Sequence, residues 1–462
     1  MKNTALTLFL FCTSLLFAQI PNEISEEEKV YGLSKFWQEV NYNFVYLNKV
    51  DREAWDAMYK NLISEVQRTP NDYEYYRLLQ KFCASLKDGH TNVYFPSEIQ
   101  NNIYTSYFGE YRIFLSNIEG KAIITRVNES KKEELPLGTE IVKVNGVPVK
   151  EYIALKVRPF IASSTDHILE DWGIERMLQG YVGTSYEVEM RLPNGKRKTL
   201  RLTHAKTLEK EVYPPFEKRE LLDIKWVGKD IAYVALNSFS DWKISSQFQE
   251  RVKELKKAKK LIVDLRYNGG GNSNVGKEIL KFLIKDTLLY GSRSQSRLHI
   301  PSFKAWGKWA KATDTLDNSW GKKAYLSYRD NAFHHFAYEA DTVSKGELVG
   351  LKKDRLVVPT AVLIGHNTAS AAEDFLIYAD KQAHMTKIGE ATFGSTGQPF
   401  LFDLPHGGVA RVCTKKDTYP DGREFVGYGI LPDIWVKKEL QDYLKDKDPV
   451  LDRAIAFLKT QK

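Results

Sequence analysis

The sequence predicts an α/β core that follows a small β domain and a helical N-terminal region. Three observations divide the 462 residues in this way. Apolar residues recur at helical spacing in residues 23–102, and short alternating strands with glycine turns fill residues 103–206. Strands then alternate with amphipathic helices through residues 207–462. A chain of this length is expected to hold two to four domains.

The N-terminus is typical of a secretory signal peptide. Lys2 precedes an apolar run, residues 5–17, and the small residue Ala18 follows it. This run is too short to span a bilayer, so we expect cleavage near Ala18, removal of residues 1–18, and export to the periplasm or the medium. No later segment has about 18 consecutive apolar residues, so no stable membrane insertion of the mature chain is expected.

Charge and cysteine content exclude some classes of protein. The net charge of +8 is spread over lysine-rich faces such as residues 253–260, and it is not gathered in one stripe. We therefore expect no nucleic acid partner. Cys83 and Cys413 remain after residue 18. They could form a disulfide, but two cysteines so far apart more often stay separate and buried.

Three helices are expected in the N-terminal region, residues 23–102. They are expected near residues 26–37, 52–68 and 72–86. Gly89 should end the third helix and leave His90 in the turn before a short strand at residues 92–96. A histidine at this place commonly does no more than interact with the last helical carbonyls.

Residues 103–206 have the strand pattern of a small β domain. The clearest strand ends in an Asn145-Gly146 turn, which is typical of hairpins. A helix is expected within residues 166–178. The order of strands, together with the run LGTEIVKVNG at residues 137–146, resembles a PDZ domain. Such domains bind an extended peptide, often its free C-terminus, at a sheet edge.

The core begins with a strand near residues 231–239, a helix near 246–257 and a buried strand near 261–266. Three glycines, residues 269–271, follow this strand and precede a helix. Backbone N–H groups at such a junction can bind an anion. A phosphate loop is disfavoured because no Gly-Lys-Ser/Thr follows, which leaves an oxyanion hole as the other interpretation.

Residues 286–356 interrupt the α/β pattern and are rich in Trp, Tyr, Lys and His. We expect an insertion or a lid over the site. His334 and His335 are adjacent, and adjacent residues rarely bind the same ion. Because no cysteine or carboxylate cluster accompanies them, neither a metal nor another cofactor is expected.

Ser370 lies at a strand-to-helix junction. Residues 362–365 have the pattern of a buried strand, residues 366–368 form a polar turn, and residues 369–373 open a helix. An enzyme can place a nucleophile at such a junction, because the turn exposes the hydroxyl and the helix offers unpaired N–H groups to an oxyanion. The alternative is an ordinary N-terminal cap.

Four motifs occur in order and together resemble the tail-specific and C-terminal processing serine proteases. They are DLRYNGGG (264–271), NTASAAE (367–373), GEATFGSTGQ (389–398) and GYGILPDI (427–434). The helical region and the PDZ-like domain also fit this family, so the resemblance covers nearly the whole mature chain outside the insertion. It implies a core of the ClpP/crotonase type and an exported serine endopeptidase. The substrate would be a peptide or protein whose C-terminal end binds the PDZ-like domain.

The same resemblance assigns roles to single residues. It implies that Ser370 is the nucleophile and that the N–H groups of Ala371 and of Gly269 or Gly270 bind the oxyanion. Processing proteases of the Ser-Lys type carry their basic lysine after the Phe-Gly of the third motif, where this chain has Ser395. A hydroxyl cannot act as a base near neutral pH, so Ser370 needs another partner.

Neither Lys381 nor Lys387 lies at the position of that lysine. The tricorn-like branch of the family takes a histidine from the N-terminal part of the chain, and LKDGHT at residues 86–91 resembles its motif. This implies that His90 is the general base, a role that suits the pKa of histidine. His366, four residues before Ser370, is the alternative base, but the motif context favours His90.

The tricorn-like branch completes its catalytic tetrad with a serine and a glutamate. Glu424 fits the glutamate, and Ser395 is the candidate serine, with an ordinary loop serine as the alternative. In tricorn the serine precedes the histidine, where this chain has Gly89. A different function stays open, namely a non-catalytic protein that binds an apolar ligand or peptide on the same fold. The missing lysine and the aromatic insertion favour this alternative.

Overall fold

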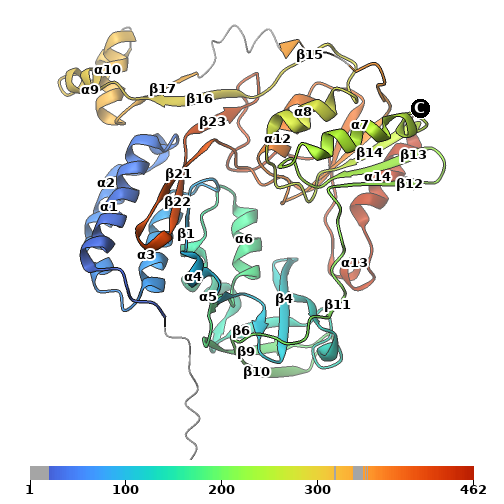
Figure 1. The fold of residues 1–462 in the computed structure, drawn as a ribbon, viewed down its shortest axis with the longest axis horizontal. Coiled ribbons are helices and arrows are strands. Elements are labelled where there is room, and N and C mark those ends of the chain that lie inside the picture. The colour runs from blue at the N-terminus through green and yellow to red at the C-terminus, as the bar shows by residue number, and fades with distance from the viewer. Residues whose placement is uncertain (1–19, 317–318, 337–346, 349, 351, 462) are drawn as a thin grey trace, which may run out of the picture.

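The computed structural model describes residues 20–316, 319–336, 347–348, 350 and 352–461 (Figure 1). The expected signal peptide, residues 1–18, lies outside these residues. Among the helices in the described part of the chain, none is both long enough and apolar enough to cross a membrane.

Three helices form the N-terminal region, as the sequence predicts. They are α1 (Glu26–Asn43), α2 (Arg52–Gln67) and α3 (Asp72–Ala84). Each begins after a polar residue, Ser25, Asp51 or Asn71, whose side chain accepts a hydrogen bond from the first turn. The buried faces of these helices share one core with β21 (Pro399–Asp403) and β22 (Val409–Cys413). The N-terminal region is therefore docked on the C-terminal part of the chain.

The short strand β1 (Asn92–Tyr94) continues this docking. It pairs antiparallel with β22, with Val93 opposite Ala410. Cys83 and Cys413 lie buried in the shared core as free thiols. Their sulfur atoms contact the carbonyl oxygens of Thr91 and Thr396, so the two cysteines remain separate.

Helix α3 ends earlier than expected, at Ala84. The left-handed residue after it is Lys87, with a φ of 53°, so the expectation that Gly89 ends this helix is wrong. Gly89 is instead needed because there is no room for a side chain at this position. An added Cβ there would lie 2.8 Å from the Phe393 ring and 3.0 Å from the Ser395 hydroxyl oxygen. The missing side chain lets this turn approach the loop that carries Ser395.

The middle of the chain forms an eight-stranded sheet with the order β10-β9-β6-β5-β4-β3, and β7 and β11 pair at its side. Asn145 and Gly146, with φ values of 51° and 76°, form the expected hairpin turn between β6 and β7. Helix α6 (Asp166–Glu175) packs against β4 and β5. The sheet strands are β3 (Tyr107–Phe108), β4 (Tyr111–Ile118), β5 (Lys121–Asn128), β6 (Glu140–Val144), β7 (Val147–Pro148), β9 (Ser185–Arg191), β10 (Arg197–Thr203) and β11 (Val212–Tyr213). The other elements of this part are α4 (Ser97–Gln100), α5 (Val149–Lys156), β2 (Ile103–Tyr104) and β8 (Gly180–Tyr181).

The α/β core contains a six-stranded sheet with the order β12-β13-β14-β19-β20-β24. Only β12 runs antiparallel to its neighbour. Helices α7, α8 and α12 cover one face and α14 covers the other. The strands are β12 (Leu222–Val227), β13 (Ile231–Leu236), β14 (Lys260–Asp264), β19 (Thr360–Ile364), β20 (Met385–Gly389) and β24 (Ile434–Trp435). The helices are α7 (Lys243–Leu255), α8 (Ser273–Leu280), α12 (Ala371–Ala379), α13 (Leu440–Leu444) and α14 (Pro449–Thr460).

The parallel pairing of β14 with β19 positions the two loops that matter most. The glycine run follows β14, and Ser370 follows β19. Because parallel strands end at the same edge of a sheet, these two loops lie side by side. The backbone confirms the contact, since the Ala369 N–H donates to the Asn268 carbonyl over 3.0 Å.

The insertion leaves the core as an arm with two helices at its tip (Figure 1). Strand β16 pairs with β17 on one side and with β23 of the core on the other. The elements of the insertion are β15 (Leu288–Leu289), β16 (Arg293–Leu298), α9 (Pro301–Gly307), α10 (Ser319–Arg329), β17 (Phe333–Phe336) and β18 (Glu347–Leu348), and the core strand that pairs with β16 is β23 (Lys415–Thr418). The side chains of His334 and His335 lie outside the described part of the structure.

Candidate active site

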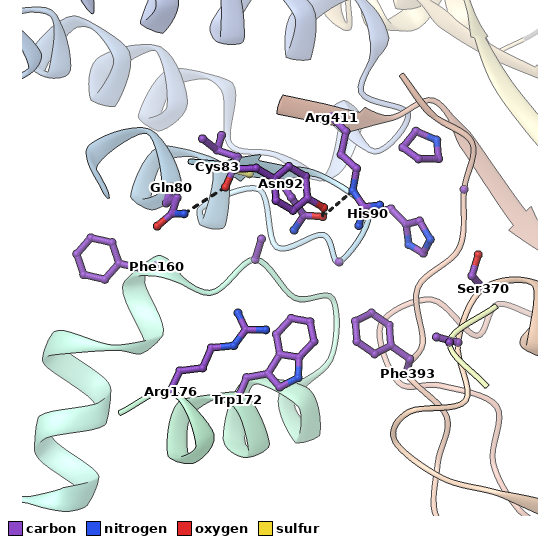
Figure 2. A pocket seen from close by; sticks show the side chains of 18 of the residues that line it. Gln80, Cys83, His90, Asn92, Phe160, Trp172, Arg176, Ser370, Phe393 and Arg411 are labelled. Atoms are coloured by element: carbon purple, nitrogen blue, oxygen red, sulfur yellow. Dashed lines mark hydrogen bonds between the residues drawn. The ribbon is translucent and has the colours of Figure 1, made fainter. Parts of the chain in front are cut away.

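A cavity of about 760 Å³ lies where the helical region, the β domain and the α/β core meet (Figure 2). The turn before β1 contributes His90, and α6 with the residue that follows it contributes Trp172 and Arg176. The loops after β14 and β19 contribute Gly269 and Ser370. Residues from all three parts of the chain therefore line one cavity.

Ser370 has the backbone of a strained turn. Its φ of 56° is in the left-handed region, which a residue with a side chain seldom adopts and which costs about 1–3 kcal/mol. The residue is half-buried and lines the cavity at the N-terminal end of α12. Such a sharp strand-to-helix turn exposes the serine hydroxyl, which is the arrangement a nucleophile requires.

Glu373 holds this turn, and the sequence alone assigned it no role. Its buried carboxyl group accepts hydrogen bonds from the Ser370 N–H (3.0 Å), the Gly394 N–H (2.8 Å) and the Thr392 hydroxyl (2.5 Å). Burial raises the pKa of Glu373 to about 8. The carboxyl group joins the strained serine to the loop after β20. The Ser-x-x-Glu spacing of a capping box was the sequence signal for it.

Of the proposed oxyanion donors, the structure keeps two and excludes one. The N–H groups of Ala371 and Gly269 have no acceptor within the described residues, and Gly269 lines the cavity. The Gly270 N–H donates to the side-chain oxygen of Asn268 over 2.9 Å. The expectation that Gly270 supplies an oxyanion donor is therefore wrong, because its N–H is already used inside the turn.

Gly270 has a steric role instead. Its φ is +99°, and an added Cβ would lie 2.7 Å from the Ala369 carbonyl oxygen and 2.8 Å from the Ser370 Cβ. We expect Gly270→Ala to lower the free energy of unfolding by about 1–3 kcal/mol, measured by urea denaturation. Gly269→Ala is the matched control, since nothing lies within 4 Å of its added Cβ. Equal losses in the two variants would contradict this explanation.

His90 and Ser395 lie together, although 305 residues separate them. The Nδ1 atom of His90 is 2.6 Å from the Ser395 hydroxyl oxygen, and Ser395 is fully buried. In the neutral tautomer that carries its proton on Nδ1, this N–H donates to Ser395 and Nε2 keeps a free lone pair. The structure thus joins the two residues that the sequence proposed as partners.

Neighbouring residues fix the turn that carries His90. The Thr91 hydroxyl donates to Asp88 over 2.7 Å and accepts the Cys413 N–H over 3.1 Å, which ties the turn to β22. Burial, together with the positive charges of Arg411 and Lys415, lowers the pKa of His90 to about 4. The imidazole is therefore neutral at ordinary pH and able to accept a proton.

Ser370 and His90 share the cavity without a direct hydrogen bond between them in the described part of the chain. Figure 2 shows His90, Phe393 and Ser370 at one end of the cavity, with Phe160 at the other. Hydrogen bonds between catalytic groups often tighten only when substrate binds. Ser370 and His90 are therefore the candidate nucleophile and base that line one cavity.

Glu424 does not join this group. Its carboxylate pairs with Lys416 and, over 3.5 Å, with Lys49, and its side chain is 41% exposed. Lys416 also lowers the pKa of Glu424. Among the described residues it makes no hydrogen bond to His90 or Ser395. The expectation that Glu424 acts together with Ser395 on His90 is therefore wrong, because two lysines hold its carboxylate at the surface.

The alternative base, His366, lies in a different cavity. Its Nδ1 atom is 2.5 Å from a carboxylate oxygen of Asp171 on α6, and its ring centre is 4.5 Å from that of His167. It lines a pocket that does not include Ser370. The two lysines considered from the sequence are also absent from the Ser370 cavity, and Lys387 pairs with Asp433 over 3.1 Å.

The insertion does not cover the cavity. None of its described residues lines the space that Ser370 and His90 share. The expectation of a lid is therefore wrong for the part of the insertion that the structure describes. The reason is its attachment, because β16 pairs with β23 and directs the arm away from the core.

Parts of this chain are similar in sequence to known proteins. Residues 230–436 match the family model described as Peptidase family S41. A carboxyl-terminal-processing protease from a Picosynechococcus species is 22% identical over 429 residues, which are 92% of this chain and 87% of that protein. The carboxy-terminal processing protease CtpA of Bacillus subtilis is 33% identical over 100 residues, which are 21% of each chain.

Among solved structures, mature CPAF bound to lactacystin has a similar fold. Its TM-score is 0.68 at 14% identity, and the match covers 94% of this chain and 98% of that one. At this identity the likeness concerns the fold. It extends over the helical region, the β domain and the α/β core together.

Proposed function

The chain carries a peptidase family S41 domain and is a relative of the carboxyl-terminal processing proteases, and on this premise we propose that Ser370 is the nucleophile of a serine endopeptidase. The resemblance that the four motifs indicated is thereby confirmed. One observation carries the proposal for the site. Ser370 lines the same cavity as His90, whose ring is held by Ser395.

The proposed reaction follows from the positions of these groups. The Ser370 oxygen attacks the scissile carbonyl carbon, and its proton passes to Nε2 of His90. The negative charge that develops on the carbonyl oxygen accepts hydrogen bonds from the N–H groups of Ala371 and Gly269. His90 then gives the proton to the leaving amine. Water attacks the acyl-enzyme by the same steps in reverse and releases Ser370.

Ser395 acts in this proposal as a positioning residue. By accepting a hydrogen bond from the Nδ1–H of His90, its hydroxyl keeps the tautomer whose Nε2 lone pair is free. A carboxylate usually takes this place in serine peptidases and stabilises the imidazolium that forms. The buried neutral hydroxyl of Ser395 orients the His90 ring but supplies no negative charge to stabilise the imidazolium.

We also propose that residues 103–206 form a PDZ-like domain that receives the C-terminal end of a peptide or protein substrate. Its helix α6 provides Trp172 to the wall of the cavity. Two side chains near the start of this helix reach the loop beside Ser395. The Thr165 hydroxyl donates to the Phe393 carbonyl over 3.1 Å, and the Ser164 hydroxyl donates to the Gly394 carbonyl over 2.8 Å. These contacts connect the domain to His90 through the loop that carries Ser395.

Export is proposed on the sequence alone. The charged start, the apolar run of residues 5–17 and Ala18 are typical of a signal peptide. N-terminal sequencing of the protein recovered from the periplasm or medium would test this. A mature chain that starts near Gln19 is the expected result.

Labelling with a fluorophosphonate probe tests the proposed nucleophile. We expect stoichiometric labelling of the wild-type protein, and peptide mass spectrometry should place the adduct on Ser370. An adduct on another serine would contradict the assignment. No labelling under conditions that label a known serine peptidase would instead favour the non-catalytic binding protein.

The pKa of His90 predicts the pH dependence of the reaction. Since the folded protein lowers this pKa from about 6.5 to about 4, the base stays neutral well into the acid range. We expect kcat/KM for a peptide to stay nearly constant from pH 7 to about pH 5 and to fall as the pH approaches 4. Circular dichroism at each pH serves as the control for unfolding. A loss of activity centred near pH 6.5 in folded protein would contradict the prediction.

A further inference from the structure

The tip of the arm carries most of the widely exposed tryptophans in the described part of the chain. We define the tip as α9, residues 308–316 and α10. Trp309 is 80% exposed and Leu316 is 79% exposed. Trp306 and Trp320 are each about half exposed. A group of exposed apolar side chains on a protein surface indicates a binding site for another protein, a membrane or a ligand.

The tip is a folded unit with a fixed shape. The rings of Phe303, Trp306 and Trp320 contact one another, with centroids 5.2–5.9 Å apart. The two helices pack closely at Gly307, where an added Cβ would lie 1.9 Å from the Ala324 carbonyl oxygen. This packing uses only part of the apolar surface, so Trp309 and Leu316 stay on the outside.

The base of the arm is held against α1. The half-buried Arg297 guanidinium donates to the Asn41 carbonyl over 2.8 Å and to the Asp330 carbonyl over 2.7 Å. The Asn331 side chain also donates to the Asn41 carbonyl, over 3.2 Å. The tip is therefore presented outward from the helical region (Figure 1). None of its described residues lines the catalytic cavity, so the proposed peptidase reaction does not explain its exposed aromatic side chains.

The charge of the tip indicates its partner. Residues 301–329 contain six Lys or Arg and only two Asp. Lys308, Lys311 and Lys322 are exposed beside the apolar side chains. Tryptophan with lysine is the combination found at the boundary between lipid headgroups and acyl chains, where the ring is buried and the ammonium group meets phosphate. A second copy of this chain fits poorly, because its own net charge is +8.

We propose that the tip is a peripheral membrane contact that inserts Trp309 and Leu316 into the surface of an anionic phospholipid bilayer. Lysines of the tip bind the lipid phosphates, and the aromatic side chains displace water at the headgroup level. The contact holds the catalytic domain at a membrane surface without a spanning segment.

Vesicle binding tests this proposal with the chain that begins at Gln19, so that the apolar run of residues 5–17 cannot contribute. We expect the protein to sediment with phosphatidylcholine vesicles that contain about one third phosphatidylglycerol, and much less with phosphatidylcholine alone. Tryptophan emission should shift to shorter wavelength on binding. Raising the salt from about 0.1 M to about 0.5 M should weaken binding.

Two variants and two matched controls locate the contact. We expect W309S/L316S and K308Q/K311Q/K322Q each to bind anionic vesicles about tenfold more weakly or less. The controls L155S/L208S and K253Q/K257Q/K259Q remove exposed leucines and lysines elsewhere and should bind as the wild type does. Equal binding by all five proteins would overturn the proposal, as would no binding to anionic vesicles. A wild-type dimer that W309S/L316S converts to a monomer, without vesicle binding, would assign the tip to self-association instead.

Discussion

Replacement of Ser370 by alanine is expected to lower kcat/KM for a peptide substrate by roughly 10⁴-fold to 10⁶-fold. The variant keeps the backbone N–H that donates to Glu373, so the strained turn and the first turn of α12 should stay in place. It loses only the oxygen that we propose attacks the carbonyl carbon. The measurement is the rate of cleavage of a peptide chosen from a library digest.

The control for Ser370→Ala is Ser240→Ala, which alters an exposed serine beside the glycine loop. Its activity should match that of the wild type. Thermal unfolding of Ser370→Ala should show an unchanged midpoint. Retention of more than about one tenth of the activity in a folded Ser370→Ala variant would refute the assignment of the nucleophile.

Replacement of His90 by alanine is the second large effect that we expect, a loss of roughly 10³-fold to 10⁵-fold in kcat. Without the imidazole, neither of the other two residues proposed for the tetrad can accept the Ser370 proton, because Ser395 is a hydroxyl and Glu424 pairs with lysines. KM should change little, since His90 removes a proton and is not proposed to bind the substrate.

His366→Ala is the comparison that separates the two histidines. It breaks the pair with Asp171, so a loss of stability is expected, but kcat should stay within about tenfold of the wild-type value. The reverse result, with activity lost in folded His366→Ala and kept in His90→Ala, would make His366 the base. Measuring both variants at one temperature, well below each unfolding midpoint, keeps unfolding out of the comparison.

Several elements of the fold were predicted correctly from the sequence. The helices of the N-terminal region, the hairpin turn at Asn145 and Gly146, and the strand before Ser370 were all predicted. Each depends on periodicity or on turn chemistry within a few residues. The end of α3 was misplaced, because Lys87 took the left-handed position that glycine usually takes.

Some residues of the candidate site were predicted correctly from the sequence, and others were not. The motifs located Ser370, His90 and Ser395, and the structure places His90 beside Ser395. Two assignments failed on hydrogen bonds that motifs do not encode. The Gly270 N–H donates to Asn268, and Glu424 is held by the nearby Lys416 and by Lys49 from the N-terminal region.

The sequence by itself determined that a serine stands at a strand-to-helix turn of an α/β core and that Ser395 follows the Phe-Gly of the third motif. Those are local facts, since short-range hydrogen bonds and apolar spacing encode them. Only the tertiary structure decided that Ser395 lies within 2.6 Å of His90 and that the aromatic arm points away from the cavity. Contacts between residues about 300 positions apart depend on how whole elements pack, and the spacing of residues along one element does not encode that packing.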